Sequence, residues 1–326
     1  MPYVTIVVPA FNVAKTLRET LDGLLAQTFE DFEIVIIDDG SNDATPEIAN
    51  SFTVDPRVRV IRQRNRGLAG ARNSGIAAAK GELIGFCDSD DVWEPAKLAM
   101  HVLHLQLNSD VGISYSGSAL IDDDSNHLGQ SQKPRLFDID AAHVFKRNPI
   151  GNGSSPVIRR AVFDAIAFRP AMETERDWYF DETFRQSEDI ECWLRIALTT
   201  DWAFEGVTGL LTQYRINANG LSAATDRQCA AWENMVNKLT LLAPEFFAQH
   251  TPAARAYQYR YLARRAISDL DADRAKRFLG ASLKQSLRPL IEEPVKTAVT
   301  VAAAFVLAVV GKQSFELLMS AKGART

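Results

Sequence analysis

The chain has 326 residues, of which 46% are hydrophobic and 24% are charged, and its formal net charge is −5. This composition is that of a folded globular protein and argues against an extended disordered chain. The negative net charge argues against a general nucleic-acid-binding protein, so we expect no nucleic-acid partner.

The cysteines and the N-terminus predict a cytoplasmic protein. Cys87, Cys192 and Cys229 are scattered and lack the CxxC spacing of a zinc site, so we interpret them as buried free thiols in a reducing compartment. The chain carries no charged side chain before Lys15 and therefore lacks the basic region of a signal peptide.

The first hundred residues predict a doubly wound α/β domain with a mostly parallel sheet. Strands are expected at residues 3–9, 32–40, 57–63 and 81–88, and helices at residues 14–27, 44–52 and 68–80. Because these strands are apolar throughout, helices should cover both faces of the sheet.

The pattern loosens after about residue 100. Further strands are expected at 111–122 and 203–215, and a helix at 187–198. From residue 224 onward the chain reads as helical, with a helical hairpin at 253–288. We therefore divide it into a domain of residues 1–222 and a helical C-terminal region of residues 223–326.

Polar clusters follow three of the predicted strands. They are "PAFN" (9–12), "DDGS" (38–41) and "DSDD" (88–91). Ligands of doubly wound sheets bind at the carboxyl ends of the strands, so these clusters should converge on one binding site.

Four segments together resemble the inverting family 2 glycosyltransferases of the GT-A fold. They are "VTIVVPAFNVAKTLRETLDGLLAQTF", "VIIDDGSNDAT", "NRGLAGARNSGIAAAKGELIGFCDSDD" and "SEDIECWLRIA", and the resemblance extends over about residues 3–217. It implies a UDP-sugar donor, a divalent cation (Mn²⁺ or Mg²⁺) and a single displacement at the anomeric carbon of the sugar. The expected products are a glycosylated saccharide acceptor and UDP.

The cluster "DSDD" is the expected metal site. Residues i and i+2 of an extended chain share a face, so Asp88 and Asp90 lie together, and carboxylate oxygens suit Mg²⁺ and Mn²⁺. The resemblance implies that Asp90 is the direct ligand, that Asp88 meets the ribose or a metal-bound water, and that Ser89 also contacts the donor. The alternative is a solvated acidic turn. A second acidic run, Asp122 to Asp124, is interpreted as a surface turn.

The other two clusters are expected to bind the nucleotide. Asp39 would accept the N3–H of uracil, although GDP remains an alternative to UDP, and "DDGS" also fits a turn with a helix cap. Arg72 would reach the diphosphate or the Asp39 carboxylate, the alternative being a solvated charge. Phe11 would stack on the base. The residues expected to shape the floor of this pocket are Pro9, Ala10 and Asn12.

The segment "SEDIECWLRI" is expected to supply the general base. By resemblance the base is Asp189, and Glu188 holds an acceptor hydroxyl. Ser187 is the expected N-cap, so both carboxylates fall in the first helical turn, where the helix dipole favours them without any catalytic role. Asn152 and Ser154 are expected to line the acceptor side, and Arg195 to be a structural partner.

Two departures from the family pattern narrow the expected activity. Many relatives place a histidine after "YR", where this chain has Asn217, which leaves the preferred metal open. The Q-x-x-R-W signature of processive synthases is missing, so we expect a non-processive enzyme.

The sequence argues against three other classes of protein. A haloacid-dehalogenase-like phosphatase would need its nucleophile on the first strand and an acidic pair later in the chain, and this chain has the two in the reverse order. A sugar nucleotidyltransferase would need a Gly-rich, Arg-containing loop after that strand, which "PAFNVAKT" is not. An inactive nucleotide-sugar-binding module would be expected to lack Asp90 or Asp189, and both are present.

The C-terminal region leaves two alternatives open. Nine Lys or Arg residues lie between Arg255 and Arg288 against three aspartates, and the uncharged run "TAVTVAAAFVLAVVG" (297–311) follows. This run falls short of the ~20 apolar residues of a transmembrane helix. It is either a core or homodimer-interface helix, or an element that holds the enzyme at the anionic inner face of a membrane, near a lipid-linked saccharide acceptor.

Overall fold

The computed structural model describes residues 1–216 and 225–323. It divides into two compact units, one of Met1–Val144 with Asn148–Gly220 and one of Phe145–Arg147 with Leu221–Thr326. The predicted domain boundary between residues 222 and 223 stays a prediction, because it lies outside the described residues.

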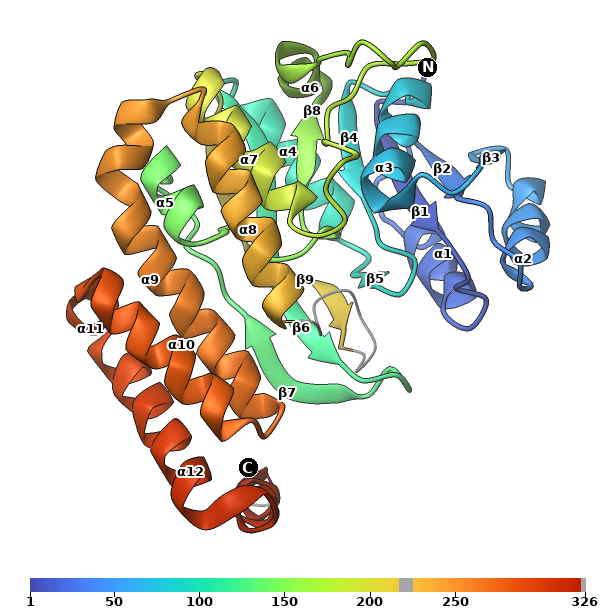
Figure 1. Cartoon of the computed structure of the whole chain (residues 1–326). Helices are drawn as coiled ribbons and strands as arrows, with labels where there is room; N and C mark the ends of the chain where they lie inside the picture. Colours follow the sequence, from blue (N-terminus) through green and yellow to red (C-terminus); the bar gives the residue numbers. More distant parts are fainter. Residues whose placement is uncertain (217–224, 324–326) are drawn as a thin grey trace. The chain divides into compact units, whose positions relative to one another are not determined.

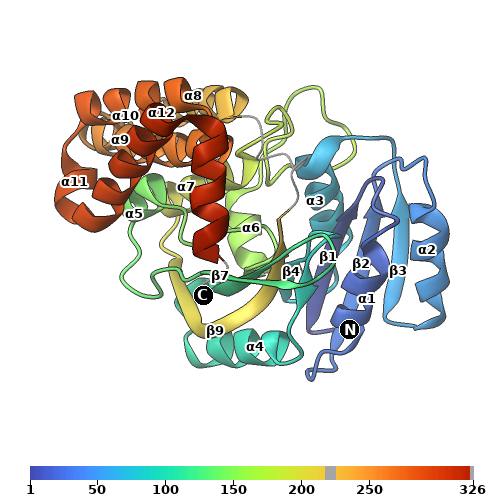
Figure 2. The same ribbon diagram turned by 90° about the horizontal axis from the view of Figure 1, so that it is seen from below.

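In the described part of the chain, nine strands of the first unit form one sheet (Figures 1 and 2). Their bounds are β1 Val4–Ala10, β2 Phe32–Asp38, β3 Val58–Arg62, β4 Leu83–Phe86, β5 Val92–Trp93, β6 Val111–Ile121, β7 His127–Gln132, β8 Val157–Arg159 and β9 Ala203–Arg215. The order is β3-β2-β1-β4-β8-β6-β9-β5, with β7 paired to β6. Strands β1 to β4 pair in parallel, as expected, and Figure 2 shows β1, β2 and β3 side by side. Antiparallel pairs enter with β8, β7 and β5.

Helices lie on both faces of the parallel strands, with α1 (Leu17–Leu25) on one face of β1 and α3 (Gly67–Ala78) on the other. The other helices of this part of the chain are α2 Thr45–Ser51, the 3₁₀ turn η1 Phe52–Val54, α4 Lys97–Leu107, α5 Ala141–Lys146, α6 Arg160–Ile166 and α7 Glu188–Thr199. Side chains of a strand alternate between its faces. Ile6 and Val8 of β1 share a buried core with Leu17 and Leu21 of α1, whereas Val7 faces α3.

Helix α3 approaches β1 closely because its residues are small. A Cβ atom built on Gly75 would lie 2.1 Å from Cγ1 of Val7, so only glycine fits at this position. Gly67, the first residue of the helix, has φ +77°, a backbone conformation that favours glycine. The sequence "GLAGARNSG" therefore holds the N-terminal half of α3 against the sheet and near the polar edge.

The second unit is helical (orange to red in Figure 1). Its helices are α8 Thr225–Thr240, α9 Pro244–Ser268, α10 Ala272–Gln285, α11 Arg288–Glu292 and α12 Pro294–Gly323. Helices α9 and α10 form the expected hairpin, and the side chain of Asp271 caps α10 by accepting from Arg274 N at 3.0 Å.

The apolar helix α12 is longer than the sequence run suggested. By length and composition alone, Pro294–Leu317 could cross a membrane, with a mean hydropathy of 1.9 and 22% of the window buried inside the protein. Gly311 (φ 77°, ψ 171°) breaks its regular geometry. The stretch before Gly311 is about 25 Å long at 1.5 Å per residue, a little shorter than a hydrocarbon core of ~30 Å.

The three cysteines are free thiols, as expected. Cys87 and Cys192 are buried, and Cys229 is only partly buried. The expectation of buried thiols therefore holds for two of them.

The contact between α3 and β1 generates a stability prediction. Gly75→Ala should lower the free energy of unfolding by about 1–3 kcal/mol, because the added methyl overpacks the site against Val7. Gly280→Ala in α10 is the matched control, since nothing lies within 4 Å of the added Cβ, and alanine should stabilise that helix by ~0.5–1 kcal/mol. Denaturant unfolding followed by circular dichroism measures both, and equal effects of the two substitutions would contradict the packing argument.

Candidate active site

The loops after β1 and β2 are joined by hydrogen bonds at the edge of the sheet. Asp39 N donates to Ala10 O at 2.8 Å, and Asn12 N donates to Ser41 Oγ at 3.1 Å. Asn12 has φ 54° and accepts from Asn42 N through its side chain at 2.9 Å. Pro9 and Ala10 are buried at the end of the strand, while the Phe11 side chain is 48% exposed. Phe11 thus follows directly on Ala10, whose carbonyl binds the backbone of Asp39, and its ring is partly exposed.

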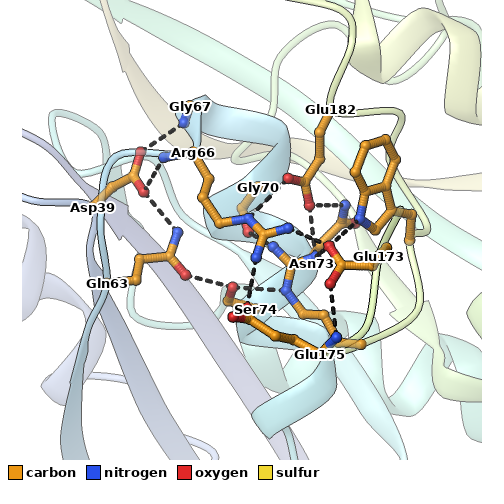
Figure 3. Close-up of polar contacts among 12 residues, drawn as sticks. Asp39, Gln63, Arg66, Gly67, Gly70, Asn73, Ser74, Glu173, Glu175 and Glu182 are labelled. Atoms are coloured by element: carbon orange, nitrogen blue, oxygen red, sulfur yellow. Dashed lines mark hydrogen bonds and ion pairs between the residues drawn. The ribbon is translucent and has the colours of Figure 1, made fainter. Parts of the chain in front are cut away.

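Asp39 lies at the N-terminus of α3. Its carboxylate accepts from Arg66 N and Gly67 N, both at 2.8 Å, and from Gln63 Nε2 at 2.6 Å (Figure 3). A carboxylate at this position is favoured by the helix dipole. Burial nevertheless raises the pKa of Asp39, against these three hydrogen bonds. Gly40 at φ +81° makes the turn that the sequence "DDGS" predicted.

Arg72 of α3 bridges two carboxylates. Its side chain is 3% exposed, and its guanidinium donates to Asp88 Oδ1 at 2.9 Å and to Glu188 Oε1 at 3.0 Å. The ring of Phe180 lies 5.5 Å from its Cζ atom. The expected contact of Arg72 with Asp39 is wrong, because Asp39 is held by Gln63 and by backbone amides instead. The alternative of a solvated charge is also wrong, because the side chain is buried and paired.

The acidic loop after β4 is held by Ser154. Ser154 Oγ accepts from Asp88 N at 2.8 Å and donates to Asp91 Oδ2 at 2.5 Å. Ser154 is wholly buried, and its expected place on the acceptor side stays a prediction. Asn152 is also buried and donates to Ser118 Oγ at 2.8 Å while accepting from Ser154 N at 3.1 Å. Both residues support the acidic loop from beneath.

Arg215 fixes the other side of the same loop. Its Nε donates to Asp90 O at 2.8 Å, its backbone N donates to Asp91 Oδ1 at 2.9 Å, and its Nη1 donates to Asp122 O at 2.7 Å. The run Asp122 to Asp124 is the turn between β6 and β7. Ser89 is buried, and its carbonyl accepts from Thr16 Oγ1 at 2.8 Å.

The crowded carboxylates fit a cation with oxygen ligands. Burial, and then the charge of Asp88, raises the pKa of Asp90 to about 6. Burial together with the charges of Asp90 and Asp88 also raises the pKa of Asp91. Among the described residues, three His, Cys, Asp or Glu side chains nowhere gather closely enough to hold a metal ion by themselves. Mg²⁺ is characteristically bound by one or two carboxylates and completed by water and substrate phosphates, which matches this donor set. Asn217 lies outside the described residues.

The first turn of α7 carries Glu188 and Asp189. Burial raises the pKa of Glu188 to about 7, with Arg72 opposing and Asp189 adding to the shift. Burial also raises the pKa of Asp189. Ser187 is the N-cap residue, as expected, but at φ 63° its side chain makes no capping hydrogen bond. Arg195 of the same helix binds Glu191 at 3.0 Å and Ile166 O at 2.8 Å, in keeping with its expected structural role.

Sequence reasoning missed four residues of this edge: Gln63, Arg66, Glu182 and Arg215. Gln63 lies two residues before the motif "NRGLAG" and Arg66 is its second residue, and a polar residue after a parallel strand would have been a usable signal. Glu182 lies in a segment without periodicity, and its partners are distant in sequence. The completed edge brings Asp39, Asp88 and Glu188 from three separate segments into one linked cluster.

The sequence of this chain is similar to those of known glycosyltransferases. The model described as "Glycosyl transferase family 2" matches residues 5–167. EpsJ of Bacillus subtilis (strain 168), an uncharacterized glycosyltransferase, is 49% identical over 92 residues, which cover 28% of this chain and 27% of that protein. RP339 of Rickettsia prowazekii (strain Madrid E), also an uncharacterized glycosyltransferase, is 26% identical over 245 residues, 73% of each chain. The matched part of a Rickettsia bellii glycosyltransferase is 34% of its length, so the chain spans only a third of that relative.

Solved structures show the same fold. TarS 1–349 of S. aureus, in complex with UDP-GlcNAc, has a TM-score of 0.54 at 18% identity, covering 92% of this chain and 89% of that one. The mannosyltransferase PcManGT of Pyrobaculum calidifontis, in complex with GDP-Man and Mn²⁺, has a TM-score of 0.50 at 19% identity, covering 99% and 80%. The predicted GT-A fold is thereby confirmed. The family match over residues 5–167 confirms the resemblance seen in the sequence: the chain belongs to glycosyl transferase family 2.

Proposed function

We propose that this family member is an inverting, metal-dependent, non-processive glycosyltransferase that moves a sugar from a UDP-sugar to a hydroxyl of a saccharide acceptor. The observation that carries the proposal is the pair of ion contacts made by Arg72, to Asp88 at 2.9 Å and to Glu188 at 3.0 Å. One buried cation thereby joins the donor-side loop to the first turn of α7. A site for transfer needs these two sides together.

On the donor side, Asp39 would accept from the imide N–H of uracil and Phe11 would cover the base. The exposed ring of Phe11 and the anionic Asp39 at a helix N-terminus support this assignment. Asp90, with Asp88, would hold a divalent cation, which when bound supplies positive charge next to the diphosphate. Arg72 would keep Asp88 oriented toward the donor rather than meet the diphosphate itself.

On the acceptor side, Asp189 would take the proton of the attacking hydroxyl. The acceptor oxygen forms a bond to the anomeric carbon, the bond from that carbon to the diphosphate oxygen breaks, and the proton ends on the Asp189 carboxylate. A single displacement of this kind inverts the anomeric configuration. Glu188, already fixed by Arg72, would hold another acceptor hydroxyl.

UDP release from a panel of UDP-sugars, with and without Mn²⁺, tests the activity and the metal together. Wild type should release UDP from one sugar far faster with Mn²⁺, and Asp90→Asn should lose most of that stimulation, because the neutral amide is a weaker ligand for a hard cation. Asp124→Asn is the matched control in the exposed β6–β7 turn. Full Mn²⁺ stimulation of the Asp90 variant would show that the metal binds elsewhere. If no UDP-sugar is turned over and GDP-mannose, assayed in parallel for GDP release, is turned over, the donor nucleotide is GDP rather than UDP.

Asp189→Asn tests the base. The substitution is nearly isosteric, so UDP affinity measured by calorimetry should survive, while transfer should fall by ~10²-fold or more. In wild type, transfer should also fall as the pH drops toward and below about 7. Burial raises the pKa values of both Glu188 and Asp189, so protonation removes the base and weakens the Arg72 pair at a higher pH than for ordinary carboxylates. Unchanged turnover of the variant would reassign the base to Glu188.

We further propose that the helical unit contacts a membrane from the cytoplasmic side, where a lipid-linked acceptor of polysaccharide synthesis would be found. Helix α12 has one face buried in the protein and an apolar face that is exposed. Its buried side chains include Thr300, Ala304 and Leu307. Its exposed side chains include Val295, Val299, Phe305 and Val309. A helix with an exposed apolar stripe and basic neighbours, here Arg264 and Lys296, suits an anionic lipid interface. The alternative is a homodimer contact.

Sedimentation with anionic liposomes tests the membrane contact. The full chain should pellet with the vesicles, and less so at high salt, since part of the attraction is Coulombic. Phe305→Glu should weaken partitioning by about tenfold or more, because burying a phenylalanine contributes ~2 kcal/mol. Met172→Glu is the control, an exposed apolar side chain of the other unit. A wild-type protein that stays in the supernatant and elutes as a dimer would favour the homodimer.

A further inference from the structure

The segment before α7 is fastened to α3 by an unusual number of polar contacts. We call residues 173–182 the strap. It carries Arg176 and three glutamates, Glu173, Glu175 and Glu182, and the glutamates are labelled in Figure 3. Arg66 contacts three of its carboxylates: Glu182 at 3.0 Å, Glu175 at 2.8 Å, and Glu173. The side chains of Glu173 and Glu182 are 6% and 8% exposed, so most of this pairing is shielded from solvent.

Glu182 is the node of these contacts. Its Oε2 accepts from Arg66 Nε at 3.0 Å, and its Oε1 accepts from Arg176 Nη1 at 2.6 Å and from Asn73 Nδ2 at 3.0 Å. Removing a buried carboxylate that receives three donors leaves those donors without their partner, which costs more than an exposed ion pair would. The position of the strap on α3 therefore depends on this side chain.

Hydrogen bonds also connect the strap to Asp39, the proposed nucleotide contact. Asp39 is held by the backbone N of Arg66, whose side chain holds Glu182. A second route passes through Gln63, which donates to Asp39 at 2.6 Å and accepts from Ser74 Oγ at 2.5 Å; Ser74 Oγ in turn accepts from Arg176 Nε at 3.0 Å. Both chains of hydrogen bonds connect Asp39, the proposed contact of the nucleotide's uracil ring, to the strap.

The strap also leads to the catalytic side. Asn73, wholly buried, accepts from the backbone N of Tyr179 at 3.0 Å and of Phe180 at 2.9 Å. The ring of Phe180 packs edge-on against Trp193 of α7, with centroids 5.6 Å apart, and lies 5.5 Å from Cζ of Arg72. Arg72 in turn holds Glu188. Movement of the strap would therefore displace the first turn of α7.

We propose that Glu182 is a positioning residue of the transfer reaction, which fastens the strap so that a nucleotide bound at Asp39 holds the first turn of α7 in place. This inference rests on the proposed function, since it takes Asp39 to be the nucleotide contact. In this proposal Glu182 acts through Arg66, Asn73 and Arg176 and not by direct contact with a substrate. Occupancy of the donor site thereby prepares the acceptor side, and an empty donor site leaves the strap and α7 more open to exchange.

Hydrogen exchange of the full chain, with and without UDP and Mn²⁺, tests the coupling. In wild type, UDP should slow exchange in residues 173–189 several-fold, because a ligand lowers the population of locally open states. Glu182→Gln should bind UDP with a Kd within about threefold of wild type, yet lose this protection. Glu175→Gln is the matched control: it removes a carboxylate from the same strap and the same Arg66, but from a side chain that is 69% exposed, so protection should persist.

The outcomes separate the two proposals. If calorimetry shows that wild type binds no UDP, the donor site is wrong and the positioning role falls with it. If UDP binds and exchange in residues 173–189 is unchanged, the donor site stands and the coupling is overturned. Retained protection in Glu182→Gln also overturns the role of Glu182. Unchanged exchange of Leu83–Phe86 in β4 shows that a variant is folded, and the wild-type comparison needs no variant at all.

Discussion

The structure of this edge depends on the burial of one positive charge. Arg72 is 3% exposed, and Asp88 and Glu188 pay back the desolvation of its guanidinium by direct pairing. A buried cation without partners would be strongly destabilising, so the fold requires both carboxylates to lie within hydrogen-bonding distance of the Arg72 guanidinium. The loop after β4 and the first turn of α7 are thereby fixed to α3, although 100 residues of chain separate Asp88 from Glu188.

A second constraint, repulsion between like charges, acts on the acidic loop after β4. Asp88, Asp90 and Asp91 repel one another at the end of β4, and burial with mutual repulsion raises the pKa values of Asp90 and Asp91. Ser154 and Arg215 satisfy Asp91 by hydrogen bonds and so hold the loop together without removing its negative potential. Carboxylates whose charges are incompletely compensated in this way support the proposed cation site.

Much of the fold could be predicted from the sequence. Continuous apolar strands separated by amphipathic helices indicated the parallel strands β1 to β4, and acidic clusters at their carboxyl ends indicated the edge that carries the site. Local rules were less reliable for individual side chains. Ser154 and Asn152 are predicted to line the acceptor side, which stays a prediction, and the structure shows both buried beneath the acidic loop. The identity of a polar residue in the sequence does not tell whether its hydrogen bonds will go to other protein groups or to a substrate.

The sequence by itself determined the longer strands and the helices α1, α2, α3 and α7, because periodicity, glycine positions and the family motifs are local properties of the chain. The short strands β5, β7 and β8 were not predicted from it. Only the tertiary structure decided the partner of Arg72 and the contacts of Glu182. An arginine has several carboxylates within reach in a compact fold, and burial selects among them through the desolvation that each pairing must offset. Glu188 lies 116 residues from Arg72, and Glu182 lies 116 residues from Arg66, so no spacing rule connects either pair.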